Sequence, residues 1–313
     1  MLKETLDILV EPITKNSLFL SESNISNNQI IEGVLKDKSG KEYKIHDGLA
    51  DFIPKKEYLT KDSPLLETWC KLQESGKKLY DTFPHLNLSV KGRKDVKIFK
   101  EFSLFHGKVL DVGCGPFIPA YLEDNKEVEF AIGIDPLVTS YNYNKTEHVD
   151  LLKAIGEFMP FADKSFDIVS FATSFDHVID PITVLSETKR ILNNDGQAIF
   201  WIEGMKYSPQ EQQAVQRDHT SRKINLEPKL KRIIRKTIKI TKKQICLNKY
   251  LGLDEQAKII DSMEIPEGAI DKFHLRHVNY NEFDEICKMV GFRLIEKKEL
   301  PEFRSTFVRY NIS

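Results

Sequence analysis

The stretch VLDVGCGP, residues 109–116, has the residue types of a ligand-binding turn. A buried strand that runs into Gly113-Cys114-Gly115 lets a ligand approach the backbone at the carboxyl edge of a sheet. A nicotinamide site of the dinucleotide type would need a third glycine three residues further on, and Ile118 occupies that position. The turn therefore predicts a ligand held against the backbone, without the dinucleotide fingerprint.

A second strand candidate ends in GIDPL, which places Asp135 roughly 20 residues after the glycines. An acid at this point accepts hydrogen bonds from ribose hydroxyls in nucleotide-binding sheets. Capping of a following helix is the structural alternative for Asp135. Combined with the glycine turn, the acid favours a cofactor that carries a nucleoside.

Three further segments follow in order, GEFMPFADKSFDIVSF, DHVIDP and ETKRILNNDGQAIFW, and a GF pair precedes the terminal strand candidates. Over about residues 105–202 and 272–310, this ordered set resembles the class I S-adenosylmethionine-dependent methyltransferases, specifically the group with a PF-x-D-x-SFD segment. The resemblance implies an α/β fold with a Rossmann-like, doubly wound sheet of seven strands, the last of them reversed. It also implies an enzyme of the EC 2.1.1 type that uses S-adenosyl-L-methionine.

Carried over residue by residue, the resemblance assigns cofactor binding to the first loop, to the acid after the second strand and to a segment that borders the adenine. The predicted contacts are Asp111, Gly113, Cys114, Gly115, Asp135, Pro136, Glu157, Phe158, Met159 and Ser174. Cys114 is expected to pack rather than to act as a nucleophile. Two positions depart from the pattern: Phe117 replaces the third loop glycine, and Ile155 stands where an acid often meets the adenine amino group. We therefore expect backbone groups to hold the adenine.

Asp176 and His177 follow the fourth predicted strand, at the sheet edge where a methyl acceptor would enter. Methyl transfer to oxygen is an in-line displacement, so the protein mainly supplies alignment and a base for the hydroxyl proton. A pKa near neutrality suits His177 to that role, and its structural alternatives are capping of the next helix and packing on the core. Asp176 and His274 are the other catalytic candidates. His274 and His277 could also be metal ligands or an acceptor-binding pair, and their structural alternatives are a local cap or a pocket wall. The sequence shows no third ligand, so no metal is expected.

Alternating strand and helix patterns must position these groups. The buried-strand candidates are KVLDV, FAIGID, DIVSFATS and QAIFWI, with a helix at PITVLSETKRIL and a turn at NNDG. This alternation predicts a parallel sheet covered by helices. NYNEFDEICKMVG is a predicted helix with Asn279 as its cap and Gly291 as its stop. FRLIEKKEL and STFVRYNI are the last two predicted strands.

Three parts are predicted along the chain. Residues 1–55 form a small β-rich appendage, whose GVLKDKSGKEYKIHDGLADFIP stretch resembles a zinc-ribbon module without its cysteines. Residues 56–104 are a helical lead-in, where PLLETWCKLQESGKKLYDT has apolar groups at helical spacing. Residues 105–313 are the predicted methyltransferase domain, with a helical insertion at about 203–271.

The composition indicates a protein of a reducing compartment. The four cysteines are scattered without paired spacing, which argues against a disulfide framework and a cysteine zinc site. The N-terminus lacks the apolar core of a signal peptide, and no apolar run approaches a membrane span. Cytoplasmic localisation is therefore expected. The 46 Lys and Arg nearly balance the 47 Asp and Glu, so the net charge indicates no partner.

Basic charge is concentrated in one segment. Residues 216–249 carry 12 Lys and Arg and two acids, which leaves 34 basic and 45 acidic residues elsewhere. Within this segment, residues 226–245 place Leu and Ile at helical spacing, with basic residues between them. Such a helix could pack on its own domain, lie at the inner face of an anionic membrane, or contact nucleic acid. The lack of interleaved aromatic residues makes nucleic acid the less favoured partner.

The motifs GIDPL, TSFDHVIDP and FW are most similar to methyltransferases found with bacterial surface-glycan and glycolipid assembly. The expected acceptor is therefore a hydroxyl of a sugar or glycolipid, as a small molecule or a lipid-linked glycan. An RNA methyltransferase is the alternative that the basic insertion and the ribbon-like N-terminus allow. A non-catalytic relative that binds the cofactor and serves as a partner protein is the third, because of Phe117 and Ile155.

Overall fold

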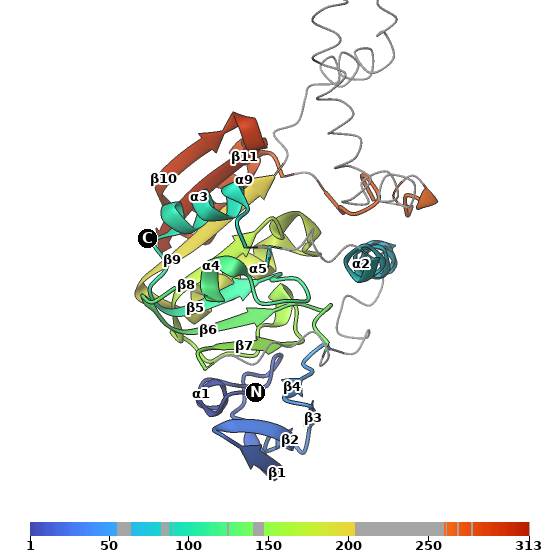
Figure 1. The fold of residues 1–313 in the computed structure, drawn as a ribbon, viewed down its shortest axis with the longest axis vertical. Helices are drawn as coiled ribbons and strands as arrows, with labels where there is room; N and C mark the ends of the chain where they lie inside the picture. Colours follow the sequence, from blue (N-terminus) through green and yellow to red (C-terminus); the bar gives the residue numbers. More distant parts are fainter. Residues whose placement is uncertain are drawn as a thin grey trace, which may run out of the picture. The chain divides into compact units, whose positions relative to one another are not determined.

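The computed structural model describes residues 1–54, 64–82, 88–89, 91–123, 125–139, 147–203, 260, 262–267, 269–276 and 278–312. The chain forms two compact units, one of Met1–Met205 with Ile265–Ser313 and one of Lys206–Glu264. The basic helix expected at residues 226–245 lies outside the described residues. All labelled strands and helices belong to the first unit (Figure 1).

A seven-stranded sheet forms the centre of this unit (Figure 1). Its strands lie in the order β7-β6-β5-β8-β9-β11-β10, and β11 runs antiparallel to both of its neighbours. The α/β Rossmann-like sheet with a reversed last strand is therefore confirmed. The strands are β5 Gly107–Val112, β6 Val128–Ile134, β7 Val149–Leu152, β8 Phe166–Ala172, β9 Leu192–Glu203, β10 Phe292–Leu300 and β11 Ser305–Ile312.

The strand order places a ligand crevice at one point of this sheet. After β5 the chain builds β6 and β7 on one side, and it then returns to add β8 on the other side. Consequently, the loops that begin at the carboxyl ends of β5 and β8 lead away from each other. Open α/β sheets bind ligands in this crevice.

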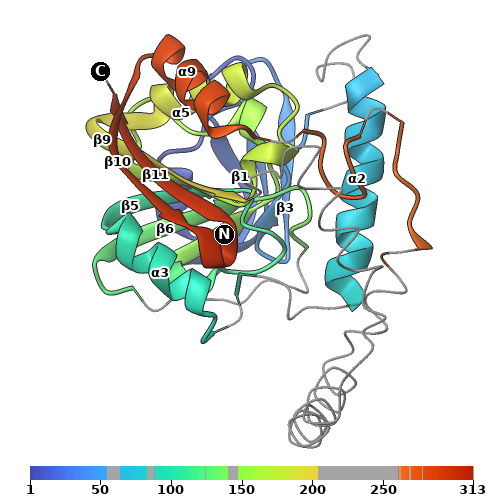
Figure 2. The ribbon, with the colours of Figure 1, turned by 90° about the horizontal axis from the view of Figure 1, so that it is seen from above.

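Helices cover both faces of the sheet, which explains why its central strands are mostly apolar and buried (Figure 2). α5 (Pro181–Ile191) and α9 (Tyr280–Val290) pack on one face, whereas α3 (Lys94–Ser103) and α4 (Ala120–Glu123) pack on the other. Aromatic side chains fill each layer. The ring centroids of Phe171 and Phe200 are 4.8 Å apart on the first face, and those of Phe99 and Trp201 are 5.3 Å apart on the second.

The helix ends follow local capping signals. The Asp180 carboxylate accepts hydrogen bonds from the N–H groups of Ile182 and Thr183 at the start of α5. Asn279 caps α9 through the N–H of Asn281, and Gly291 ends that helix at φ 96°.

The predicted turn at NNDG is wrong, because these residues belong to β9. They lie where the β8–β9 register shifts, so the polar stretch is an irregularity within a strand.

The N-terminal residues form a second, antiparallel sheet of four strands (Figure 1). Buried apolar side chains fill its core, and the described residues of this sheet include no cysteine. Apolar packing therefore holds the sheet together. The elements are α1 Lys3–Leu6, β1 Phe19–Ser26, β2 Gln29–Lys36, β3 Glu42–His46 and β4 Leu49–Ala50. Helix α2 (Pro64–Thr82) follows this sheet in the sequence. The chain also has three short 3₁₀ turns, η4 Gly156–Phe158, η5 Phe175–His177 and η6 Pro301–Phe303, within the described residues.

This N-terminal module covers the edge of the central sheet at β7. The buried Asp150 carboxylate of β7 accepts hydrogen bonds from the Leu2 N–H at 2.7 Å and the Thr5 hydroxyl at 2.5 Å. The Phe52 N–H donates to the Lys153 carbonyl at 2.7 Å, and the Lys153 N–H donates to the Ala50 carbonyl. An edge strand with unpaired backbone groups is thereby protected.

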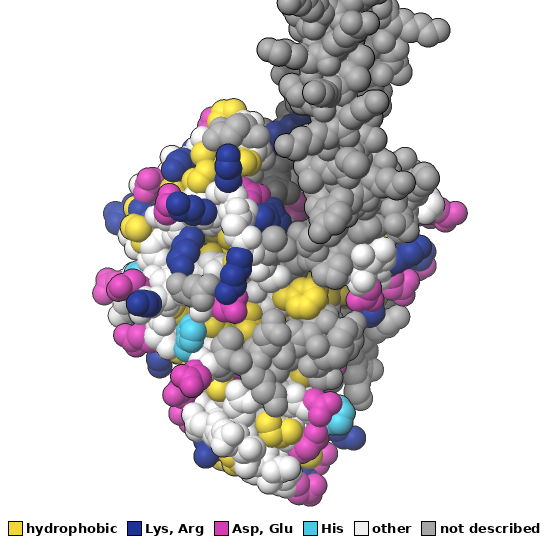
Figure 3. Space-filling view, viewed as in Figure 1, with side chains coloured by type: hydrophobic (Ala, Val, Ile, Leu, Met, Phe, Trp, Pro, Cys, Tyr) yellow, Lys and Arg dark blue, Asp and Glu magenta, His cyan; other side chains and the backbone are white. Residues whose placement is uncertain are grey.

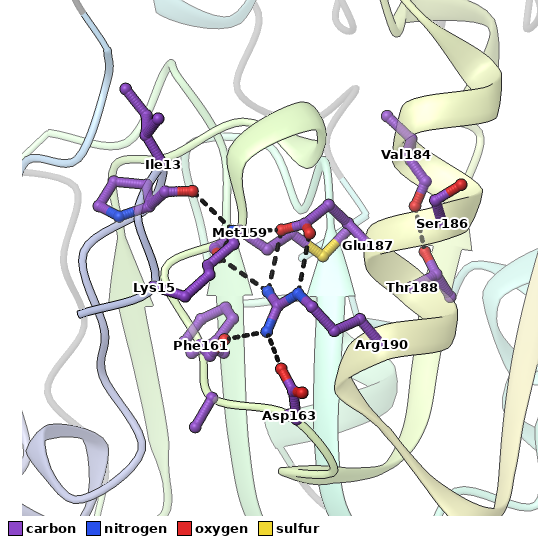
Figure 4. Close-up of polar contacts among 12 residues, drawn as sticks. Ile13, Lys15, Met159, Phe161, Asp163, Val184, Ser186, Glu187, Thr188 and Arg190 are labelled. Carbon is purple, nitrogen blue, oxygen red and sulfur yellow. Dashed lines mark hydrogen bonds and ion pairs between the residues drawn. The ribbon is translucent and has the colours of Figure 1, made fainter. Parts of the chain in front are cut away.

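A half-buried ionic network attaches the same module to α5 (Figure 4). The Lys15 ammonium lies 2.6 Å from a Glu187 carboxylate oxygen, and Glu187 also pairs with Arg190. Arg190 donates in turn to the Phe161 carbonyl and to Asp163. The network thus holds residues 159–163 against α5, directly after the η4 turn.

None of the described helices is long and apolar enough to cross a bilayer. On the face drawn in Figure 3, the described basic and acidic side chains are interspersed rather than separated by sign. This mixture accords with the near balance of charges in the sequence.

Candidate active site

A cavity of about 320 Å³ opens at the carboxyl ends of β5, β6 and β8, at the crevice expected from the strand order. Loops after three strands, the η5 turn and helix α2 all contribute to its wall. The predicted residues that line it are Gly113, Cys114, Gly115, Asp135, Pro136, Glu157, Ser174, His177 and His274. The sequence signals after separate strands therefore converge on one space.

The turn after β5 is left-handed at both glycines. Gly113 has φ 76° and Gly115 has φ 75°, a region that side-chain-bearing residues rarely adopt. The Gly113 N–H donates to the Ile134 carbonyl at 2.8 Å, which ties the turn to the end of β6. The Cys114 thiol is buried and packs toward Gly133, and burial raises its pKa well above the usual value. Cys114 is thus a packing residue of the turn.

Asp135 joins the two cofactor motifs directly. Its carboxylate accepts hydrogen bonds from the Gly115 N–H at 2.9 Å and the Leu137 N–H at 2.7 Å. The side chain is nearly buried but borders the cavity. Burial raises its pKa to about 6, although both backbone hydrogen bonds oppose that rise. A carboxylate with unused lone pairs facing a cavity suits the hydroxyl groups of a ribose.

Three predicted contacts stand behind the cavity wall instead of lining it. The Asp111 carboxyl is fully buried and accepts hydrogen bonds from the hydroxyls of Tyr121 and Ser170. Burial raises its pKa to about 6. Met159 lies in the core, and Phe158 packs against a small apolar cluster. These residues support the strands and turns that carry the site.

Glu157 lines the cavity, and one of its carboxylate oxygens is hydrogen-bonded to the backbone at the start of α5. That oxygen accepts hydrogen bonds from the Ile179 N–H at 2.6 Å and the Asp180 N–H at 3.1 Å. Burial raises the pKa of Glu157. Arg276 donates to the Ile179 carbonyl at 2.6 Å, so it ties the segment before α9 to the same point.

On another part of the wall, the lining histidines His177 and His274 both lie beside Asp176. The Asp176 carboxylate oxygens lie 3.6 Å from Nε2 of His177 and 3.5 Å from Nε2 of His274. Asp271 contacts Nδ1 of His274 at 2.8 Å, and the His177 ring has a hydrogen bond with the backbone of Phe273. Burial lowers the pKa of His177, which favours its neutral form. All three predicted catalytic candidates are thus neighbours, whereas His277 lies outside the described residues.

Helix α2 forms a cavity wall that sequence reasoning missed. Trp69, Leu72 and Gly76 line the cavity, and Trp69 and Leu72 pack with Ile155 in a buried apolar cluster. Ile155 therefore continues an apolar wall at the position where the family pattern often has an acid. The helical spacing of the apolar residues was a signal for the helix, but it held no information about which surface the helix would cover.

Residues 110–200 match the model of a family described as a methyltransferase domain. Similar solved structures include a SAM-dependent methyltransferase from Aquifex aeolicus, with 17% identity, a TM-score of 0.45, and coverage of 76% of this chain and 98% of that chain. The PH0226 protein from Pyrococcus horikoshii OT3 has 16% identity, a TM-score of 0.47, and coverage of 75% and 99% respectively. No curated protein matches the sequence.

Proposed function

The chain contains a class I S-adenosylmethionine-dependent methyltransferase domain, and we propose that it transfers the methyl group to a hydroxyl of a sugar or glycolipid. S-adenosylmethionine supplies a methyl group on a positively charged sulfur, which is already activated for displacement. The observation that carries the hydroxyl assignment is the cluster of Asp176, His177 and His274 at the cavity that Asp135 also borders. The sugar or glycolipid class follows from the motif resemblance.

The cavity fits the cofactor by its chemistry. The left-handed turn at Gly113 and Gly115 keeps side chains away from a bound ligand, and Asp135 offers a carboxylate to ribose hydroxyls. Trp69, Leu72 and Ile155 provide an apolar wall for a flat base. Within the described residues, these groups would hold and orient the cofactor.

The histidine cluster would serve the acceptor. A hydroxyl is a weak nucleophile until its proton is removed, so transfer to oxygen benefits from a base at the reacting atom. The lowered pKa of His177 keeps an imidazole available to take that proton near neutral pH. Amine acceptors that are already neutral need less of this help, which is why the cluster favours oxygen.

An acceptor panel tests this assignment. The full chain is incubated with radiolabelled S-adenosylmethionine and with three sets of acceptors: hydroxyl-bearing sugars and glycolipids, primary amines, and RNA. We expect label only in the sugar or glycolipid set, and a stable ether should survive mild alkali. Label confined to RNA or to amines would overturn the hydroxyl assignment while leaving cofactor use intact.

A further inference from the structure

The three polar side chains at the acceptor part of the cavity have the spacing of metal ligands. One ligand atom each from Asp176, His177 and His274 lies within 4.8 Å of the other two. Oδ2 of Asp176 lies 3.5 Å from Nε2 of His274, and Oδ1 lies 3.6 Å from Nε2 of His177. These distances are longer than a hydrogen bond between the same atoms would be.

The 3.6 Å separation involves Oδ1 of Asp176 and the 3.5 Å separation involves Oδ2, and each is close to the edge length of a coordination tetrahedron. Ligand atoms that each lie about 2.0–2.2 Å from a tetrahedral ion are about 3.4 Å from one another. A carboxylate hydrogen-bonded to both imidazoles would draw closer to them than the observed distances. Among the described residues, the buried Oδ1 of Asp176 accepts no hydrogen bond, so one of its lone pairs is available to a cation.

Both imidazoles are also oriented from behind, as metal-binding histidines usually are. Asp271 holds Nδ1 of His274 at 2.8 Å, which turns Nε2 toward Asp176. The His177 ring also has a hydrogen bond with the backbone of Phe273, and its Nε2 lies 3.6 Å from the same carboxylate. A carboxylate or carbonyl partner on the second nitrogen fixes the tautomer and strengthens a histidine ligand.

From this geometry we infer that Asp176, His177 and His274 bind a divalent transition-metal ion, with a fourth position open to the acceptor hydroxyl. Two imidazoles and one carboxylate are a ligand set for Zn²⁺ and similar ions, with an open position as in catalytic sites. Mg²⁺ and Ca²⁺ prefer sites made of oxygen ligands, which this cluster is not.

The role of the ion rests on the proposed transfer to a hydroxyl, whereas its binding does not. A hydroxyl that coordinates the ion has a lowered pKa and releases its proton to solvent. The resulting oxygen forms a bond to the methyl carbon while the carbon–sulfur bond breaks, and the sulfonium becomes a neutral thioether. The imidazoles then act as ligands, and the ion takes over the activation that His177 would otherwise provide as a base.

Cobalt binding tests the site without relying on activity. The full chain, free of affinity tags and treated with a chelator, is titrated with Co²⁺, whose visible absorption becomes intense in a tetrahedral site. We expect one bound Co²⁺ per chain, displaced by one equivalent of Zn²⁺. His274→Ala should abolish the signal, and Asp271→Asn should weaken Co²⁺ affinity by about 10- to 100-fold because the ligand loses its orientation.

The exposed group of Glu32, His46 and Asp47 provides the matched control. His46→Ala should leave the absorption spectrum and the stoichiometry unchanged. Melting curves and cofactor titrations establish that each variant is folded, and Asp176→Asn replaces His274→Ala if that protein does not fold. Absence of saturable Co²⁺ and Zn²⁺ binding, or binding lost with His46 and retained without His274, would overturn the inference. Either result leaves the acceptor panel to decide the proposed function separately.

Discussion

Gly113 and Ser174 occupy the ends of neighbouring strands and leave no room between them for another carbon atom. A Cβ built on Gly113 would lie 2.3 Å from the Cβ of Ser174. The Ser174 hydroxyl donates to the Val112 carbonyl at 2.5 Å, which fixes this approach. The first glycine of the turn is therefore required by the junction of β5 and β8, as well as by any ligand at the backbone.

Gly113→Ala should destabilise the fold by about 1–3 kcal/mol or more, because overpacking adds to the cost of a positive φ. Gly40→Ala is the matched control, since Gly40 has φ 87° and nothing within 4 Å of an added Cβ. Urea unfolding measures both free energies. Equal losses in the two variants would show that the contact with Ser174 contributes nothing.

The sequence predicted strands and helices well where a periodic apolar pattern was followed by a residue that ends the element. Gly291 separates α9 from β10, and both of these elements have the predicted bounds to within one residue. The short strand β7 was missed because four buried residues have no periodicity of their own. The composition of NNDG is that of a turn, but the residues on either side of it, Leu192 and Gln197, both pair with β8, so NNDG forms an irregularity inside one strand.

The sequence could predict the site residues that follow strands, but it could not predict those that helix α2 and the segment before α9 contribute. Asp135 and His177 follow strands, and the carboxyl ends of parallel strands meet at one edge. Asp271 could not be singled out, because its contact with His274 matters only once His274 lies beside Asp176. The same holds for Trp69, whose place against Ile155 depends on how α2 packs.

Cofactor affinity should fall as the pH is lowered through about 6. The pKa of Asp135 is raised to about 6 by burial, so the carboxylate predominates above that pH and the neutral acid below it. Ribose hydroxyls bond more strongly to the charged form, so the dissociation constant should rise by up to tenfold for each pH unit below 6. Calorimetric titration between pH 5 and pH 8 measures this slope.

Asp135→Asn isolates the titrating group. The variant should bind the cofactor more weakly at pH 8 and lose most of the pH dependence of its affinity. Any remaining pH dependence is due to Asp111, whose pKa is also about 6.

The folding stability of the cofactor-free protein should change with pH in the opposite direction to its cofactor affinity. A folded-state pKa above the unfolded value of 3.8 means that stability decreases as the pH rises from about 4 to about 6. A wild-type dissociation constant that does not change with pH would contradict the role of Asp135.

Asp150→Ala should loosen the N-terminal module from β7. The substitution leaves the Leu2 N–H and the Thr5 hydroxyl without their buried acceptor, at a cost of about 1–3 kcal/mol for each unsatisfied group. Asp51→Ala removes an exposed ion pair with Lys153 in the same contact and should cost less than about 1 kcal/mol. Proteolysis of the N-terminal residues and thermal melting report the difference, and equal melting temperatures would contradict this account.

His177→Ala should lower turnover by about 10²- to 10⁴-fold while cofactor affinity stays within twofold of wild type. The reason is that His177 serves the acceptor side of the cavity, whether as a base or as a metal ligand. His106→Ala, on an exposed histidine that contacts the Leu104 carbonyl, is the control and should retain full turnover. A parallel loss of cofactor affinity in His177→Ala would reassign the residue to a structural role.

Calorimetric titration of the full chain with S-adenosylmethionine tests the central claim most directly. We expect saturable binding at one site per chain, with a dissociation constant in the micromolar to millimolar range, and similar binding of the demethylated product. Asp135→Ala should weaken binding by about 1.5–3 kcal/mol, since the charge-assisted bonds to the ribose are lost. If folded wild-type protein shows no heat of binding up to millimolar cofactor, the assignment of this cavity to S-adenosylmethionine is contradicted.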